Sequence, residues 1–242
     1  MRPLTESMPK AMLRVDNQPF VDLQLAWLRR QGITDVVFCI AHLGEQIVAH
    51  VGDGSRWSLR VRYSDEGPDR LGTAGALRLA ADRDLIADDV FVLYGDSYLQ
   101  LSLAEVEIAH RTSRRPALMT VYHNLAALER CNVRYVDGVV SLYQKGVDDP
   151  SALGMFHIDY GLQVYSRQTI VDRVSAGDVV DLSDVQHSLS VDGLMAGFEV
   201  SDRYYEIGST SGLRALEEHL QNSGAAVHPA SGRRDLRSAA RR

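Results

Sequence analysis

The sequence has little cysteine, no long apolar run and no leader-like start. Cys39 and Cys131 are its only cysteines, and neither has a cysteine or histidine partner at a metal-binding spacing. We therefore expect reduced thiols and an intracellular protein. No apolar run approaches the roughly 20 residues that a membrane-spanning helix needs, and the amino terminus lacks the basic-then-apolar pattern of a signal peptide. These absences predict a cytoplasmic protein without a membrane partner.

The chain also has no excess of positive charge. Its formal net charge is -6 over 242 residues, so nothing draws the whole molecule onto nucleic acid, and an anionic small ligand would need a local cationic pocket. With 45% hydrophobic and 24% charged residues, the composition is that of an ordinary globular protein. After Asn222 apolar residues become scarce, which predicts one domain at 1–222 and a disordered tail at 223–242.

Strand-like and helix-like segments alternate along the chain. The apolar, β-branched run at 33–42 indicates a strand covered on both faces, and 89–96 is a second apolar strand. This alternation predicts an α/β fold with a Rossmann-like, mostly parallel sheet. Asp137-Gly138 predicts a hairpin turn between two shorter strands. Further strands are expected at 59–66, 117–123, 132–138, 139–145, 155–166, 193–200 and 203–208, and helices at 20–31, 45–50, 73–84 and 211–221.

Four polar clusters fall where an open α/β sheet binds ligands, beyond the carboxyl ends of its strands. Lys10 lies in a loop where its ammonium group could reach a phosphate. The small residues Gly72–Gly75 open a helix and would let a ligand approach the backbone. Asp96 follows an apolar strand and Glu206 closes another, so the two carboxylates could hold one Mg²⁺ ion between them.

Each cluster also has a plainer interpretation. Lys10 could be a solvated surface lysine, and helix packing against a sheet explains small residues at 72–75 equally well. Asp96 could serve as a helix cap or a turn residue. The residues taken one at a time therefore leave these alternatives open.

Taken in order, the motifs resemble those of the sugar-1-phosphate nucleotidyltransferase family. The resemblance runs from Met1 to about Leu220, and the form Gly95-Asp96-Ser97-Tyr98 is similar to the mannose and heptose-1-phosphate guanylyltransferase branch. The motifs that carry it are Arg2-Pro3-Leu4-Thr5, Pro9-Lys10-Ala11-Met12, Leu71-Gly72-Thr73-Ala74-Gly75-Ala76, Gly95-Asp96, Gln144-Lys145, Asp159-Tyr160-Gly161 and Glu206-Ile207-Gly208.

The resemblance implies an enzyme with the fold of nucleotide-diphospho-sugar transferases, which is GT-A-like. Such an enzyme joins a nucleoside triphosphate, here with GTP favoured over UTP, to a sugar 1-phosphate and releases pyrophosphate. By similarity, Lys10 and Asp96 are catalytic, and Asp96 and Glu206 bind Mg²⁺. The other implied site residues are Leu71, Gly72, Thr73, Ala74 and Gly75 for the nucleotide and Gln144, Lys145, Asp159 and Gly161 for the sugar phosphate. A homo-oligomer is compatible with this assignment.

The sequence departs from the family at its start. In the family an apolar strand and a G-x-G-T-R loop precede R-P-L-T, and the printed sequence has neither. We therefore expect the central first strand to be missing and hypothesise that Met1 is an internal methionine. The alternative to this hypothesis is a genuine truncation, and the alternative function is that of a non-catalytic protein that binds sugar nucleotides or acts as a regulator. A glycosyltransferase would need a second acid after Asp96, and a dinucleotide oxidoreductase would need G-x-G-x-x-G after a strand.

Overall fold

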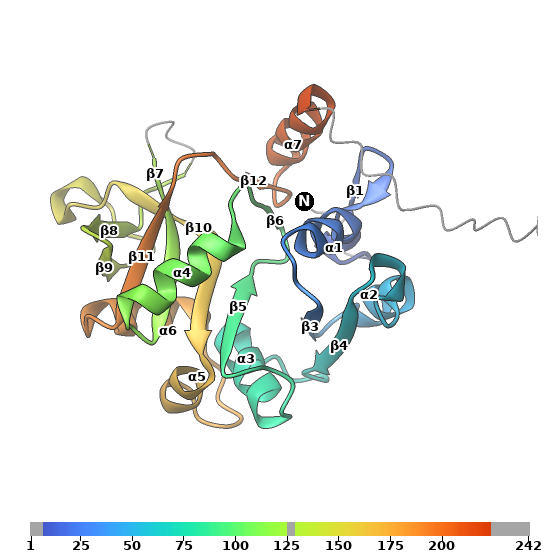
Figure 1. Cartoon of the computed structure of the whole chain (residues 1–242), viewed down its shortest axis with the longest axis horizontal. Helices are drawn as coiled ribbons and strands as arrows, with labels where there is room; N and C mark the ends of the chain where they lie inside the picture. The colour runs from blue at the N-terminus through green and yellow to red at the C-terminus, as the bar shows by residue number, and fades with distance from the viewer. Residues whose placement is uncertain (1–6, 125–128, 224–242) are drawn as a thin grey trace, which may run out of the picture.

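The computed structural model describes residues 7–124 and 129–223 (Figure 1). The tail predicted at 223–242 lies outside this part of the chain except for Ser223, where the last helix ends. The helices are η1 (Lys10–Met12), α1 (Phe20–Arg30), α2 (Gly44–Val51), η2 (Ser55–Trp57), α3 (Gly72–Asp82), α4 (Leu103–Ser113), η3 (Ser151–Leu153), α5 (Arg167–Arg173), α6 (Leu182–Val191) and α7 (Thr210–Ser223). The strands are β1 (Arg14–Val15), β2 (Gln18–Pro19), β3 (Asp35–Ile40), β4 (Arg60–Asp65), β5 (Asp89–Leu93), β6 (Ser97–Tyr98), β7 (Ala117–His123), β8 (Val133–Val136), β9 (Val139–Tyr143), β10 (His157–Ser166), β11 (Met195–Val200) and β12 (Tyr205–Glu206).

A six-stranded sheet with the order β5-β10-β7-β11-β9-β8 forms the centre of the molecule. β7 and β11 are parallel, as are β3 and β4 in a separate two-stranded sheet. The predicted α/β class with parallel strands is therefore confirmed. The parallel order does not extend across the whole sheet, because β10 runs antiparallel to both β5 and β7 and the β8–β9 hairpin is antiparallel.

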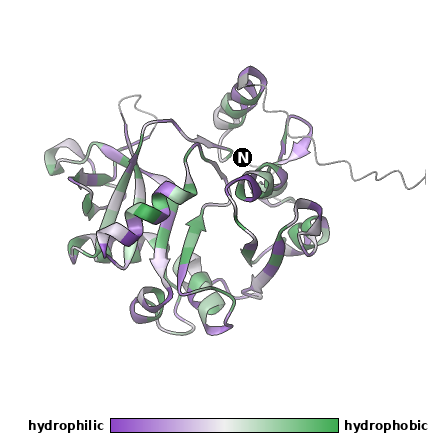
Figure 2. Cartoon of the chain, in the orientation of Figure 1, coloured by the Kyte–Doolittle hydropathy of each residue, from purple (hydrophilic) through white to green (hydrophobic). Residues whose placement is uncertain are grey.

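Helices cover both faces of the six-stranded sheet (Figure 1). β7 alternates between the two cores: Met119 packs in a cluster with residues of α3, α5 and α6, whereas Leu118 packs with residues of α1 and α4. Figure 2 shows the corresponding apolar character of β7 and β5 inside the molecule. A strand buried on both faces reads as a continuous apolar run, which is how 117–123 reads in the sequence.

The shorter elements also follow from local sequence. Asp137 and Gly138 have φ values of 49° and 80°, the left-handed conformation that a two-residue hairpin turn requires, and they join β8 to β9 as predicted. The predicted helices at 20–31, 45–50, 73–84 and 211–221 match α1, α2, α3 and α7. Within the described residues, no helix combines the length and the hydrophobicity that crossing a membrane demands.

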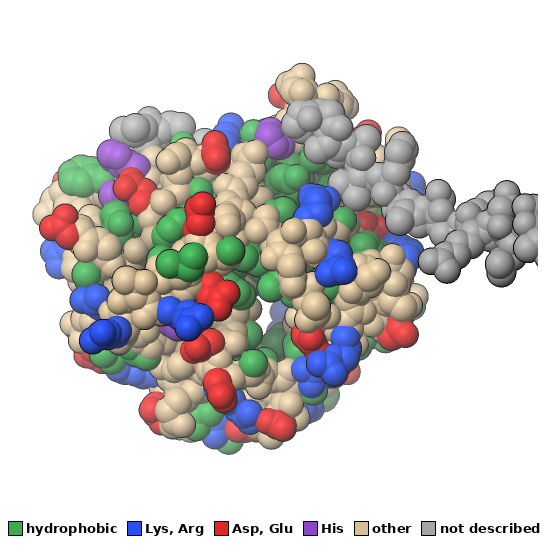
Figure 3. Space-filling model, in the orientation of Figure 1, with side chains coloured by type: hydrophobic (Ala, Val, Ile, Leu, Met, Phe, Trp, Pro, Cys, Tyr) green, Lys and Arg blue, Asp and Glu red, His purple; other side chains and the backbone are tan. Residues whose placement is uncertain are grey.

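An open cavity of about 1350 Å³ separates β3 from β5. Residues from both strands line it, and within the described residues β3 pairs only with β4 and β5 only with β10. Figure 3 shows the molecule hollowed between its two halves in this view. The prediction that 33–42 forms a strand covered on both faces is wrong in this respect: residues 35–39 are half-buried or exposed because the cavity lies beside them.

The free edge of β5 predicts a pattern of hydrogen exchange. The amide of Tyr94 donates to the Gly161 carbonyl and that of Arg167 to the Asp88 carbonyl, so the alternation of an antiparallel pair directs the amides of Val90 and Val92 toward β10. The amides of Phe91 and Leu93 then face the cavity.

We expect Phe91 and Leu93 to exchange at least about fivefold faster than Val90 and Val92, because one net backbone hydrogen bond contributes about 1 kcal/mol. Residue-specific exchange followed by NMR measures this. Equal protection of all four amides would mean that the outer edge of β5 has a partner.

Candidate active site

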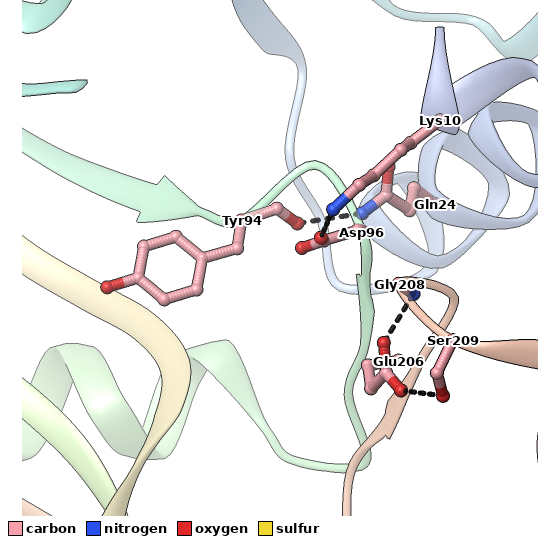
Figure 4. Close-up of polar contacts among 7 residues, drawn as sticks. All are labelled: Lys10, Gln24, Tyr94, Asp96, Glu206, Gly208 and Ser209. Carbon is pink, nitrogen blue, oxygen red and sulfur yellow. Dashed lines mark hydrogen bonds and ion pairs between the residues drawn. The ribbon is translucent and has the colours of Figure 1, made fainter. Parts of the chain in front are cut away.

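Lys10 and Asp96 meet although 86 residues separate them in sequence. Lys10 opens η1, and Asp96 lies in the turn between β5 and β6. The Lys10 Nζ atom donates to the Asp96 Oδ2 atom at 3.0 Å, with half of the lysine side chain and a third of the aspartate side chain exposed (Figure 4). The sequence predicts a site containing both residues, and the structure brings them together. An exposed pair of this kind contributes little to stability, so both groups can respond to a ligand.

Gln24 of α1 holds the loop that carries Asp96. Its Nε2 atom donates to the carbonyl oxygens of Tyr94, at 3.1 Å, and Ser97, at 3.0 Å, and its side chain is buried (Figure 4). The two carbonyls flank Asp96, so one amide group restrains the backbone on both sides of that carboxylate. Gln24 stands between Leu23 and Leu25 on the buried side of α1, and sequence reasoning missed it. A lone amide inside an apolar helix face was the available signal.

Glu206 reaches the same place from the other end of the chain. β12 pairs with β6 so that Glu206 lies opposite Ser97, and the Ile207 amide donates to the Asp96 carbonyl at 3.0 Å. The Glu206 carboxylate accepts hydrogen bonds from the Gly208 amide and, at 2.6 Å, from the Ser209 hydroxyl (Figure 4). The pairing of two short strands therefore places the backbone of Glu206 beside the loop that carries Asp96.

The donor set at this place fits Mg²⁺. Asp96 and Glu206 supply carboxylate oxygens, the ligands that hard cations prefer, from two adjacent backbone segments. The side chain of Asp96 remains partly exposed, so water and phosphate oxygens can complete the coordination. That these two residues bind Mg²⁺ stays a prediction.

The start of α3 is occupied by another segment of the chain. The amides of Ala74 and Gly75 donate to the Val180 carbonyl, at 3.0 and 3.3 Å, and the Leu71 carbonyl accepts from the Val180 amide. A Cβ atom on Gly72 would collide with the Val180 carbonyl, and Gly72 has a φ of +74°. The packing interpretation of these glycines is therefore sufficient, and their predicted contact with a nucleotide stays a prediction.

Thr73 connects this helix start with the start of α6. The Thr73 Oγ1 atom accepts from the Leu182 amide at 2.7 Å. The hydrogen bond from the Ser183 amide is the main reason that the pKa of Asp181 is lowered, with smaller contributions from the charge of Lys145 and a hydrogen bond from Thr73. The charge of Lys145 thus reaches Asp181, the residue that caps the start of α6. Gln144 precedes Lys145 just after β9. Its side chain is exposed, and its backbone N–H donates to the Asn132 carbonyl.

Asp159 lies inside a network of hydrogen bonds on β10. Its carboxylate accepts from Tyr94 Oη at 2.7 Å, from Gln163 Nε2 at 2.7 Å, from Gln186 Nε2 at 3.2 Å and from the Gly161 amide at 3.0 Å. Burial nevertheless raises the pKa of Asp159 above its ordinary value. Figure 4 shows the Tyr94 ring pointing away from Lys10 and Asp96, and its hydroxyl is the group that donates to Asp159.

Gly161 has a packing reason of its own. Its φ is +99°, and an added Cβ atom would press on the Ser97 side chain. The predicted roles of Asp159 and Gly161 in a sugar pocket stay predictions, because every Asp159 contact described above is with the chain itself.

The cavity beside β5 extends to the predicted site. Its lining includes Lys10, Gly72, Thr73 and Gly95 as well as Arg70. The full lining carries four cationic residues, Lys10, Arg60, Arg62 and Arg70, and four acidic ones, Asp35, Glu66, Asp84 and Asp89. A ligand entering the cavity would therefore meet charges of both signs, with Lys10, the helix start at Gly72 and Gly95 of the Asp96 loop among its neighbours.

Comparison with known proteins identifies the family and the fold. The model of the family described as "Nucleotidyl transferase" matches residues 1–129. The chain is 27% identical over 219 residues to an N-acetylmuramate alpha-1-phosphate uridylyltransferase of Neisseria meningitidis, covering 90% of this chain and 91% of that protein. It is 27% identical to a UTP–glucose-1-phosphate uridylyltransferase of Synechocystis over 75% of this chain, and it spans half the length of that relative.

Two further matches extend the comparison. A mannose-1-phosphate guanylyltransferase of Mycobacterium tuberculosis is 29% identical over 80% of this chain and 53% of its own length. Among solved structures, the inositol-1-phosphate CTP transferase of T. maritima superimposes with a TM-score of 0.71 at 18% identity, covering 94% of this chain and 92% of that one. The structural match confirms the fold.

Replacing Gln24 by leucine tests the restraint on the Asp96 loop. The variant leaves two carbonyls without their donor, so we expect a loss of about 1–3 kcal/mol in the free energy of unfolding. Denaturant unfolding of wild type, Gln24→Leu and Gln168→Leu measures it, since Gln168 is exposed on α5 and serves as a matched control. If Gln24→Leu and Gln168→Leu have the same free energy of unfolding, Gln24 does not restrain the Asp96 loop.

Burial of Asp159 predicts a pH dependence of stability. Because its pKa in the folded protein lies above the ordinary 3.8, the folded state holds this proton more tightly than the unfolded chain. The contribution of Asp159 to stability therefore falls as pH rises above that ordinary value. In Asp159→Asn, the partnerless Oε1 atoms of Gln163 and Gln186 can turn to accept from the new amide.

We expect the unfolding free energy of Asp159→Asn minus that of wild type to increase as pH rises from about 4 to about 7. Denaturant titrations at several pH values measure the difference. If this difference decreases or stays constant with rising pH, the raised pKa of Asp159 is contradicted.

Proposed function

The chain belongs to the nucleotidyl transferase family, and we propose that it joins a nucleoside triphosphate to a sugar 1-phosphate, giving a nucleotide sugar and pyrophosphate. The meeting of Lys10, Asp96 and the Glu206 segment, next to a cavity that Lys10 and Gly95 line, carries this proposal. Relatives with matching sequences are named as transferases of this reaction type.

The reaction requires the protein to neutralise the negative charge of the phosphate groups and to align the attacking oxygen with the leaving group. A sugar phosphate oxygen forms a bond to the α-phosphorus while the bond from that phosphorus to the pyrophosphate oxygen breaks. In the free protein Lys10 is paired with Asp96. An incoming triphosphate offers the Lys10 ammonium further anionic oxygens, so the lysine holds the nucleotide and the leaving pyrophosphate. Lys145, whose charge reaches Asp181 at the start of α6, would orient the sugar phosphate for the attack.

Asp96 and Glu206 would hold Mg²⁺ in this proposal. The ion, when bound, supplies positive charge against the phosphate oxygens. Gln24 restrains the Asp96 loop and Ser209 restrains the Glu206 carboxylate, so both side chains keep their directions before substrate arrives. Such preorganisation lowers the reorganisation required during the reaction.

For the nucleotide we propose GTP, which the form of the sequence around Gly95-Asp96-Ser97-Tyr98 favours. The Mycobacterium tuberculosis relative is named a guanylyltransferase. The meningococcal relative, matched over nearly its whole length, is named a uridylyltransferase of an amino sugar phosphate and makes UTP the alternative. Pyrophosphate release measured in parallel with GTP and UTP, each with mannose 1-phosphate and N-acetylmuramate 1-phosphate, decides between them.

Replacing Asp96 by asparagine tests the site directly. It preserves the shape of the side chain but removes its charge, and we expect turnover to fall at least about a hundredfold, the scale of one preorganised electrostatic contact. Lys10→Ala should raise the KM for the triphosphate. Asp172→Asn, exposed on α5 away from the cavity lining, serves as the control and should keep wild-type kinetics.

Two results would contradict the proposal. Unchanged turnover in Asp96→Asn would remove that carboxylate from the reaction. Binding of GTP or UTP by the wild-type chain without pyrophosphate release, with either sugar phosphate present, would favour a sugar-nucleotide-binding protein instead of an enzyme.

A further inference from the structure

Three side chains with metal-binding groups meet at one end of the six-stranded sheet. His123 is the last residue of β7, His157 is the first of β10, and Glu199 lies near the end of β11. These three strands are neighbours in the sheet. None of the three residues belongs to η1, to the turn between β5 and β6 or to β12, which carry Lys10, Asp96 and Glu206.

The register places the three side chains on the same face. His157 lies directly opposite His123, and Glu199 lies opposite Val121. Residues two apart on a strand point to the same side. His123 therefore lies on the same face of the sheet as Val121, and His157 and Glu199 lie on that face too. The convergence therefore follows from the backbone pairing and does not depend on the rotamer of one side chain.

The side chains are also close to one another. His157 Nε2 and Glu199 Oε1 are 3.2 Å apart, and the two imidazole rings stack with 4.8 Å between their centroids. One possible ligand atom from each residue can be chosen so that all three lie within 4.8 Å of one another. The Tyr135 ring packs edge-on against His157 at 5.2 Å and limits the motion of that imidazole.

This set of groups matches the chemistry of a zinc site. Two imidazole nitrogens and one carboxylate oxygen are a known zinc ligand set, and bonds of about 2.0–2.2 Å bring tetrahedral ligand atoms to about 3.4 Å from each other. His123 is exposed and the Glu199 side chain is 45% exposed, whereas the His157 side chain is 12% exposed. The exposed side chains of His123 and Glu199 can therefore move to coordinate an ion that is held by the more buried His157 imidazole. Solvent can supply a fourth ligand.

We propose that His123, His157 and Glu199 bind one divalent transition-metal ion of the zinc class, at a site separate from the proposed Mg²⁺ site. Among the described residues, the ion pair of Glu199 is with His157, so no lysine or arginine competes for the carboxylate. A bound ion would tie together the ends of β7, β10 and β11 and stabilise the folded state by mass action.

Titration of the full chain, free of any histidine tag, with ZnCl₂ in a calorimeter tests the proposal. We expect one zinc ion per chain and a dissociation constant that excess MgCl₂ leaves unchanged, because imidazole ligands favour zinc over hard cations. His123→Ala and Glu199→Gln change exposed side chains, and each should weaken binding at least about tenfold, the smallest loss that outer-shell changes cause in zinc sites.

Matched variants separate this site from others. His219→Ala on α7 and Glu107→Gln on α4 should bind zinc like the wild type, and so should Asp96→Asn at the proposed Mg²⁺ site. Zinc binding that survives both His123→Ala and Glu199→Gln, or that is lost in Asp96→Asn, would overturn the proposal. Thermal unfolding with and without ZnCl₂ gives a second readout. The zinc-dependent rise in Tm should disappear in His123→Ala and in Glu199→Gln, and it should remain in the control variants.

Discussion

The pairing of two very short strands, β6 and β12, is the interaction on which the candidate site depends. It joins residues more than a hundred positions apart, and the Ile207 amide donates to the Asp96 carbonyl beside it. A cluster of buried side chains from both ends of the chain holds this pair in place, among them Phe20, Tyr98, Ile207 and Leu216. The site therefore exists only when the amino-terminal, middle and carboxyl-terminal segments are folded together.

Polar groups inside the protein support this arrangement at some cost. The backbone of Tyr94 is fixed by Gln24, and its hydroxyl donates to Asp159. Through Tyr94, the loop beside Asp96 is linked to a buried carboxylate that four donors hold in place. Burial of Asp159 opposes its ionisation while the hydrogen bonds favour it, and the raised pKa shows that burial has the larger effect. A site built on such a network gains rigidity from groups that a purely apolar core would lack.

Local patterns predicted the elements, whereas long-range contacts decided their details. Apolar runs identified β5 and β7, and Asp137-Gly138 identified its hairpin, because these signals lie within a few residues. The order of motifs also pointed to Lys10, Asp96 and Glu206 as one site. The role of Gln24 could not be predicted, since its partners are about 70 residues away. The glycines at 72 and 75 indicated close approach correctly, but the sequence could not tell that the approaching group is the chain's own backbone near Val180.

The cavity between β3 and β5 also has a mechanical consequence. No ladder of backbone hydrogen bonds joins the β3–β4 pair to β5 in the described part of the chain. Side chains such as Arg62, which donates to the Leu85 carbonyl, and Arg83, which donates to the Asp65 carbonyl, connect the two sides. A small shear of the pair past β5 therefore breaks no strand pairing. Because α3 contacts β3 and β4 on one side and α5 and α6 on the other, such a shear would be transmitted to the helix start at Gly72 and would change the width of the cavity mouth.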